Sequence, residues 1–145
     1  MEPLCLIRDK QQLRGTCYFE FLPGKYKGQC WNEGSVFLPE EVFSYLEQVI
    51  RRHESRFDHY AFTAIRRPTW EKIIADLERL TAKIGEAEAV SDLESDVGFF
   101  FSDSAREFAK DFRVNADRLA ALTRDLVAWL QEQLQKEDCV SVLGM

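Results

Sequence analysis

The 145-residue sequence contains none of the short motifs by which most small enzymes are identified. There is no G-x-S-x-G nucleophile elbow, no G-x-x-x-x-G-K-[ST] or G-x-G-x-x-G phosphate loop, and no H-E-x-x-H zinc site. Histidine is scarce, with His53 and His59 alone, and no two cysteines are in a C-x-x-C arrangement. We therefore expect no catalytic residue that a motif can name, and neither a bound cofactor nor a metal ion.

Long apolar runs are missing as well. No stretch approaches the roughly 18 consecutive apolar residues of a membrane-spanning helix, so we expect no membrane partner. The segment Met1–Cys5 has no basic region followed by a continuous apolar stretch. We therefore expect no secretory signal and a cytoplasmic location.

The four cysteines are too few and too dispersed for a disulfide framework without a secretory signal. Cys5, Cys17 and Cys139 have apolar neighbours, and we expect them in the core as small hydrophobic side chains. Cys30 lies beside Trp31 in a polar stretch and is the cysteine that we expect at the surface.

Acidic residues predominate only in the second part of the chain. The formal net charge is −6, but residues 1–85 carry +1 and residues 86–145 carry −7. A net acidic chain is a poor ligand for nucleic acid, whose phosphates favour clustered Lys and Arg. The acidic excess begins with six carboxylates that no Lys or Arg interrupts: Glu86, Glu88, Asp92, Glu94, Asp96 and Asp103. These residues form either a solvated loop or a patch for a basic partner.

The predicted partner-binding site combines these six carboxylates with Tyr26 and Trp31. Both aromatic residues lie in the Gly-containing stretch Lys25–Ser35, which predicts a long loop or loose hairpin. Tyr and Trp bury a large area while losing few rotamers, as residues that dominate binding energies do. Carboxylates without local countercharge repel one another, and a basic partner would relieve that repulsion.

Hydrophobic periodicity predicts a single α+β domain over residues 1–145, with about four helices packed on a small sheet. Pro39 and Pro68 are each expected in the first turn of a helix, and Gly85 is expected to end the second helix. Ser102 and Asn115 are candidate caps of two further helices. The expected extended segments are Leu4–Ile7, Thr16–Leu22, Phe57–Ile65, Cys139–Leu143 and, as a strand or buried corner, Phe99–Phe101.

The expected core joins the second and fourth of these helices. Trp70, Ile74 and Leu77 recur at helical spacing and form an apolar stripe. The last helix carries a similar stripe, in which we expect three residues to face the first stripe: Leu122, Leu126 and Trp129.

Other residues are weaker candidates for function. His53, His59 and Cys30 would form an unrecognised enzyme site if the fold brought them together. Five basic residues are either solvated or form a cationic rim for an anionic partner: Arg51, Arg52, Arg56, Arg66 and Arg67. A third alternative is a self-associating adaptor that uses an apolar helix face.

The stretches Trp31–Pro39, Phe57–Ile65 and Trp70–Ile74, with the terminal Val140–Gly144 after an amphipathic helix, resemble small bacterial immunity proteins. Such proteins are the cytoplasmic antidotes of polymorphic toxins delivered by contact-dependent or type VI systems. The resemblance implies no catalytic residues. It implies inhibition by tight, stoichiometric docking to one cognate toxin domain, commonly a nuclease or another enzyme.

Overall fold

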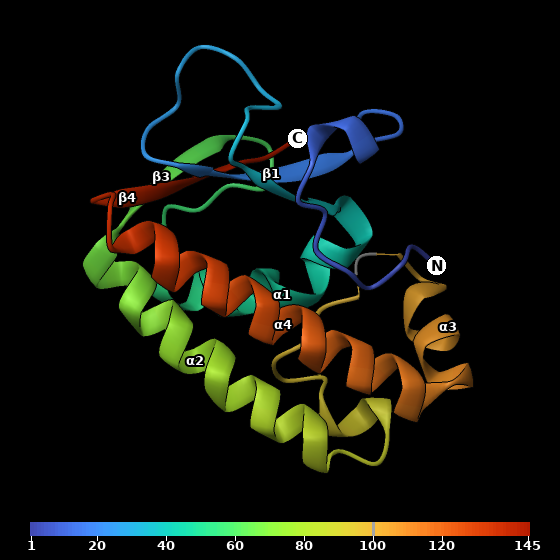
Figure 1. Cartoon of the computed structure of the whole chain (residues 1–145). Helices are drawn as coiled ribbons and strands as arrows, with labels where there is room; N and C mark the ends of the chain where they lie inside the picture. The colour runs from blue at the N-terminus through green and yellow to red at the C-terminus, as the bar shows by residue number, and fades with distance from the viewer. Residues whose placement is uncertain (100) are drawn as a thin grey trace.

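One antiparallel sheet lies over a layer of helices, as Figure 1 shows. The computed structural model describes residues 1–99 and 101–145. Within these residues the sheet has four strands in the order β2-β1-β4-β3. The strands are β1 Tyr18–Pro23, β2 Val36–Pro39, β3 Phe62–Arg66 and β4 Cys139–Leu143. The two central strands therefore come from near opposite ends of the chain.

Four α-helices of the described residues lie below the sheet in Figure 1. They are α1 Glu40–His53, α2 Arg67–Glu86, α3 Ser104–Lys110 and α4 Phe112–Leu134. Two short 3-10 helices are η1 Lys10–Gln12 and η2 Val90–Asp92. The predicted α+β class, with about four helices and a small sheet in a single domain, is confirmed.

The predicted contact between α2 and α4 is present, and the two helices lie side by side (Figure 1). Trp70 is fully buried, and its indole Nε1 donates a hydrogen bond of 3.0 Å to the carbonyl of Val140 in β4. The bond satisfies the one polar atom of a side chain that buries a large apolar area. The other residues of both stripes are also buried: Ile74, Leu77, Leu122, Leu126 and Trp129.

The strand expected at Phe57–Ile65 is shorter than predicted, because β3 begins only at Phe62. Phe57 and His59 are nevertheless buried, as the alternation required. Phe57 packs against Phe43 of α1 with ring centroids 5.8 Å apart. It is therefore buried because the turn that carries it packs on α1, and not because it belongs to a strand. The expected strand Leu4–Ile7 is reduced to one isolated bridge between Ile7 and Phe37.

Three predicted helix boundaries are wrong by a few residues. Gly85 lies inside α2, which ends at Glu86. The third helix begins at Ser104 instead of Ser102. Asn115 lies within the first turn of α4, where its side-chain amide donates to the carbonyl of Phe108 and links α3 to α4. In the expected segment Phe99–Phe101, Phe99 is half-buried and Phe101 exposed, and residue 100 lies outside the described residues.

Candidate partner-binding surface

The two faces of the sheet have different environments. Side chains alternate between faces along a strand, and Phe19, Phe21, Val140 and Val142 belong to the hydrophobic core on the helix side. The opposite face, here called the outer face, carries Glu20 of β1 and its cross-strand neighbour Leu143 of β4. The chain between β1 and β2, residues 24–35, arches away above the sheet in Figure 1. This segment is here called the β1–β2 loop.

Glu20 holds the β1–β2 loop on the outer face. Its carboxylate is buried and accepts backbone hydrogen bonds from Trp31 at 2.6 Å and Asn32 at 2.9 Å. The Asn32 side-chain amide and the Ser35 hydroxyl donate to the same carboxylate, at 3.0 and 2.6 Å. A buried carboxylate is tolerated when hydrogen bonds satisfy it, and bonds to a charged acceptor are strong. Glu20 therefore fixes the conformation of the loop.

Trp31 has a backbone conformation that the loop must enforce. Its φ is 62°, and no other non-glycine residue in the described ranges has a positive φ. Such a conformation is strained for a bulky residue and persists only where surrounding bonds over-determine it. The hydrogen bond from Trp31 N–H to Glu20 is one of those bonds. Glu20 therefore helps to hold Trp31 in this conformation.

The Trp31 indole borders a hollow in the outer face. The hollow has a volume of about 180 Å³, below the roughly 300 Å³ at which small-molecule sites begin. The residue Trp31 is 36% exposed, and its ring meets Tyr18 edge-on, with centroids 6.3 Å apart. The lining residues are Thr16, Tyr18, Glu20, Cys30, Trp31, Leu143, Gly144 and Met145. A hollow of this size suits one side chain of a protein partner.

A second pair of exposed aromatic rings lies at the β3 side of the outer face. Tyr26 of the loop packs on Phe62 of β3 with centroids 4.8 Å apart, and each side chain remains nearly half exposed. Tyr60, in the turn before β3, is 69% exposed. Sequence reasoning identified Tyr26 and Trp31 but missed Phe62, although the alternation had already placed Phe62 opposite the buried Ile65.

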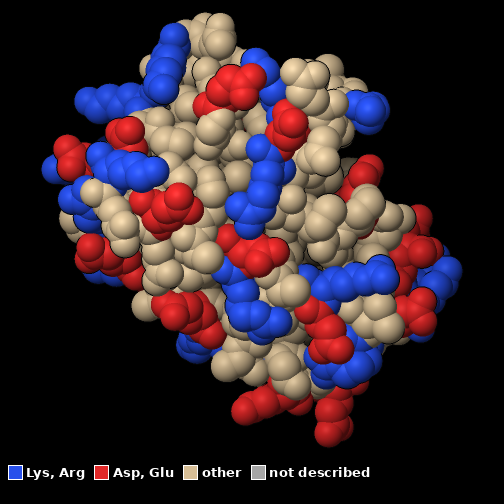
Figure 2. All heavy atoms as spheres, viewed as in Figure 1, with Lys and Arg blue, Asp and Glu red and all other residues tan. Residues whose placement is uncertain are grey.

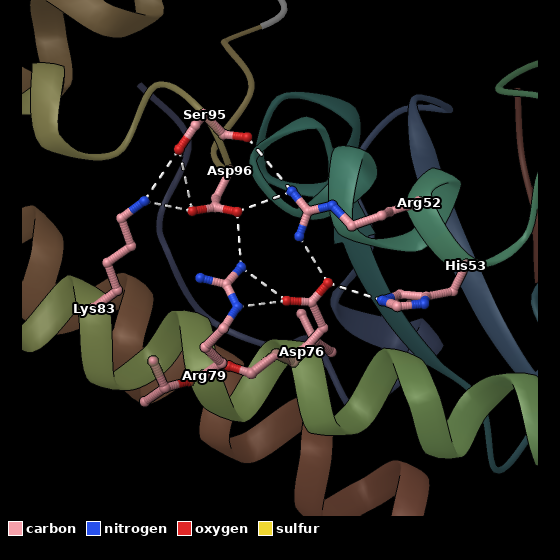
Figure 3. Close-up of polar contacts among 9 residues, drawn as sticks. Arg52, His53, Asp76, Arg79, Lys83, Ser95 and Asp96 are labelled. Atoms are coloured by element: carbon pink, nitrogen blue, oxygen red, sulfur yellow. Dashed lines mark hydrogen bonds and ion pairs between the residues drawn. The ribbon is translucent and has the colours of Figure 1, made fainter.

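Asp96 is not part of a free acidic patch. It is buried, and Lys83, Arg79 and Arg52 contact its carboxylate at 2.6, 2.8 and 2.9 Å (Figure 3). Burial alone would raise the pKa of Asp96, but the hydrogen bonds from these three cations hold it well below its usual range. The expectation that this carboxylate lacks countercharge is therefore wrong, because the cations come from distant parts of the sequence.

A second carboxylate, Asp76 of α2, completes the same cluster. It accepts hydrogen bonds from Arg52 at 2.7 Å, from Arg79 at 2.8 Å and from the ring of His53 at 2.8 Å. Figure 3 shows these side chains converging from α1, α2 and the segment that precedes α3. The six residues, here called the ion network, are Arg52, His53, Asp76, Arg79, Lys83 and Asp96.

The remaining predicted carboxylates differ among themselves. Asp92 accepts the backbone N–H groups of Glu88 and Ala89, and Asp103 pairs with Arg106 at 3.3 Å. Glu86, Glu88 and Glu94 are exposed, and their carboxylates have neither an ion pair nor a hydrogen bond among the described residues. This acidic segment and the β1–β2 loop lie at opposite ends of the molecule in Figure 1. The predicted site is therefore two separate surfaces.

The five basic residues do not form a cationic rim, which was the alternative to a solvated set. Arg51 pairs with Glu47 at 2.7 Å, and Arg56 pairs with Glu54 at 3.2 Å. Arg67 donates to the carbonyls of Leu134 and Glu137, and so satisfies groups at the end of α4. Arg52 belongs to the ion network, whereas Arg66 is exposed. On the face shown in Figure 2, acidic and basic side chains are interspersed.

The three residues of the alternative enzyme site lie in three different environments. His59 is buried between two carboxylates of α1, with its Nε2 2.7 Å from Glu40 and its Nδ1 2.7 Å from Glu47. Burial lowers the pKa of His59, but the bonds to Glu40 and Glu47 outweigh it and raise the pKa above its usual value. His53 contacts Asp76 in the ion network.

Cys30 is exposed, as predicted, and lines the hollow. Partial desolvation of the thiol at the edge of the hollow and the nearby Glu20 carboxylate raise its pKa, so the reactive thiolate is disfavoured. Cys139 is buried as expected. The prediction for Cys5 and Cys17 is wrong, because both are exposed. Cys17 lies directly before β1, and Cys5 lies in the segment Leu4–Ile7, which forms only the isolated bridge at Ile7. No group of three or more His, Cys, Asp or Glu side chains in the described residues is placed to hold a metal ion.

Comparison with protein-family models, with curated proteins and with solved structures finds no match for this chain. Among the helices of residues 1–99 and 101–145, none is long and apolar enough to cross a membrane. The outer face of the sheet, with its hollow and its exposed aromatic rings, is therefore the candidate site, on geometry alone.

Proposed function

We propose that this chain is a non-enzymatic immunity protein of the cytoplasm that binds one cognate bacterial toxin domain and neutralises it by stoichiometric docking. One observation carries the proposal. A buried carboxylate, Glu20, holds an exposed Trp31 at the rim of a hollow sized for a single side chain. The class of partner rests on the resemblance of the sequence to immunity proteins, with a nuclease or another enzyme as the toxin.

The geometry favours binding because the loop is ordered before a partner arrives. Tight interfaces depend on a few aromatic anchors near a pocket, and affinity falls when loops must be ordered on binding. Four hydrogen bonds to Glu20 have already fixed the loop that carries Trp31. Tyr26 extends the aromatic surface toward β3. Trp31 is therefore proposed as the main anchor.

The side chains that an enzyme would need are engaged in other contacts. His59 bonds to two carboxylates and His53 to Asp76, and the Cys30 thiol has a raised pKa. This arrangement supports docking over catalysis, because none of the three side chains forms a nucleophile–base pair.

The exposed acidic residues have a secondary role in the proposal. The segment with Glu86, Glu88 and Glu94 begins where α2 ends, at the opposite end of the molecule from the β1–β2 loop (Figure 1). Charge at that distance steers a basic toxin and changes the association rate, whereas the aromatic contacts set the dissociation rate.

The proposal predicts a toxin domain encoded beside the gene for this chain, and the test uses that domain. Co-expression should restore growth, and calorimetry should give one chain per toxin domain. Replacing Trp31 by Ala should weaken binding about 30-fold or more, as loss of an aromatic anchor does. Val114→Ala, which shortens another exposed side chain on α4, is the matched control and should bind normally.

Two further variants separate docking from catalysis. His53→Gln and Cys30→Ser should protect cells as well as the parent chain does. Because Cys30 lines the hollow, only a loss of protection with both toxin binding and the thermal midpoint unchanged would identify an enzyme. A parent chain that neither binds the neighbouring toxin domain nor protects against it would end the proposal.

A further inference from the structure

β3 is an open edge of the sheet. It pairs with β4 on one side, and no strand of the described residues pairs with it on the other. The opposite edge is partly covered, because Ile7 exchanges two backbone hydrogen bonds with Phe37 of β2, at 3.0 and 2.8 Å. Natural proteins protect open edges with charge, proline or bulges, or they use them to pair with another chain. The open edge of β3 is therefore a candidate site for pairing with another chain.

The register shows which residues offer free backbone groups. Gly144 N–H donates to Ala61 C=O, and Arg67 N–H donates to Asp138 C=O, at the two ends of the β3–β4 ladder. Hydrogen bonding alternates along an antiparallel pair, so the odd-numbered residues of β3 bond to β4. The even-numbered residues direct N–H and C=O away from β4: Phe62, Ala64 and Arg66. All three are exposed.

These three residues are complementary to themselves. If a second β3 approaches antiparallel with Ala64 opposite Ala64, Phe62 lies opposite Arg66 of the second copy, and Arg66 opposite its Phe62. Ala64 then exchanges two bonds with Ala64 of the second copy, and each Arg66 N–H donates to Phe62 C=O of the other copy. The Arg66 C=O, which as the N-cap carbonyl of α2 already accepts within the helix, has a second lone pair for Phe62 N–H. The smallest shift of one strand along the other that keeps their outer faces on the same side is two residues. That shift loses one of the three residue pairs.

The side chains favour the same register. Arg66 over the ring of Phe62 in the second copy forms a cation–π contact, and the two Arg66 side chains lie at opposite ends of the pairing. Tyr26 already packs on Phe62 and enlarges the ring surface. Ala64 at the two-fold axis is small enough for close approach. The charge pattern thus places no like charges opposite each other, which would destabilise a strand pair.

We propose that the occupant of the β3 edge is a second copy of this chain, joined antiparallel about a two-fold axis at Ala64. The two four-stranded sheets then form one continuous sheet. This inference goes beyond the proposed docking to a toxin. The hollow beside Trp31 is lined by β1, the β1–β2 loop and the C-terminal end of β4, so it stays open in the dimer.

Sedimentation velocity of the parent chain over a range of concentrations is the first measurement. We expect a reversible change from the mass of one chain, 16.9 kDa, to twice that mass. Ala64→Lys places two ammonium groups against each other at the axis and should raise the dimer dissociation constant about tenfold or more. Ala75→Lys adds the same charge at an exposed alanine of α2 and should leave dimerisation unchanged.

Cross-linking tests the register directly. Residues opposite each other in a hydrogen-bonded pair have Cα atoms about 5.5 Å apart, a distance that a disulfide can span. In a background with Cys5, Cys17 and Cys30 changed to Ser, Ala64→Cys should give a covalent dimer on oxidation, whereas Ala75→Cys should not.

Three results would overturn the inference. They are a single-chain mass at every concentration, a dimer that Ala64→Lys does not weaken, and amide protection at Ala64 that arises only when the toxin domain binds. The last result would assign the edge to a strand of the toxin. Ala64→Lys should still bind that domain through Trp31, so failure of the dimer is distinguishable from failure of the proposed function.

Discussion

Two buried carboxylates at opposite ends of the molecule are stabilised in different ways. Asp96, in the ion network, is enclosed by the cations Arg52, Arg79 and Lys83. Glu20, on the outer face, accepts hydrogen bonds from neutral donors of the β1–β2 loop. The first arrangement cross-links elements that are distant in sequence, whereas the second fixes a single loop. Asp96 should therefore matter for global stability, and Glu20 for local order and binding.

The largest effect is expected from Asp96→Asn. The substitution keeps the size of the side chain but removes the charge that three cations share. Breaking a buried ion pair costs about 3–5 kcal/mol, but Arg52, Arg79 and Lys83 are each 35–49% exposed and can return to water. With that screening, we expect unfolding in urea to become easier by about 2–3 kcal/mol.

Glu94→Gln is the matched control for Asp96→Asn, because it also removes one carboxylate charge from the same segment. Glu94 is exposed, and its loss should change the free energy of unfolding by less than about 0.5 kcal/mol. Equal effects of the two substitutions would show that Asp96 contributes to stability only through net charge. The contrast between Asp96 and Glu20 would then disappear.

The ion network also explains which parts of the molecule could be predicted from sequence. Trp70 and Leu77 were assigned to the core because helical spacing alone places them on one face of α2. The partners of Asp96 are 13 to 44 residues away in sequence, and no local pattern connects them. The run of carboxylates without nearby Lys or Arg therefore predicts one free acidic patch. In the folded chain the run is divided, because Asp96 belongs to the ion network.

The outer face was predicted in part for a similar reason. Tyr26 and Trp31 stand in a Gly-containing segment, which indicates exposure. Glu20, by contrast, occupies a polar position in an alternating strand, where a solvated carboxylate is the ordinary expectation. Its burial depends on the path of the β1–β2 loop, and the contact of Tyr26 with Phe62 depends on the sheet order. Both features depend on tertiary structure, which the alternation of polar and apolar residues along one strand cannot predict.

Glu20→Gln should have a smaller effect on stability and a larger one on binding. The amide can accept from fewer donors than the carboxylate, and it points its own N–H groups at the backbone of Trp31 and Asn32. We expect a loss of about 1–2 kcal/mol in unfolding free energy, typical of an unsatisfied buried group. Hydrogen exchange should rise in residues 29–35 and stay unchanged in α2.

Binding of the toxin domain gives the second measurement for Glu20→Gln. A loop that must be ordered on binding lowers affinity without removing a contact. The dissociation constant should therefore rise although Trp31 is intact. Global exchange in place of exchange confined to the loop would show that Glu20 supports the whole sheet, contrary to the local role assigned to it.

The smallest effect, and the one that best sharpens the comparison, is the pH dependence due to His59. Both of its ring nitrogens lie 2.7 Å from carboxylate oxygens, so both must donate, which only the protonated ring can do. Burial lowers the pKa of His59, but Glu40 and Glu47 outweigh it and raise the pKa above the usual 6.5. The folded state therefore holds the proton at pH values where the unfolded chain has released it. By linkage, this contribution to stability is fully present below pH 6.5 and is lost as pH rises through the raised pKa of the folded state.

Urea titrations from pH 6 upward should accordingly show the unfolding free energy of the parent chain falling with pH. His59→Gln should be less stable at pH 6 and should lose most of that slope, because a neutral side chain has no proton to release. Every other titratable group, His53 of the ion network included, is common to the parent and His59→Gln, so the difference between their two slopes reports His59 alone. If the parent and His59→Gln lose stability in parallel, the imidazolium between Glu40 and Glu47 does not contribute to the fold, and the sheet end contains no ionic support comparable to the ion network.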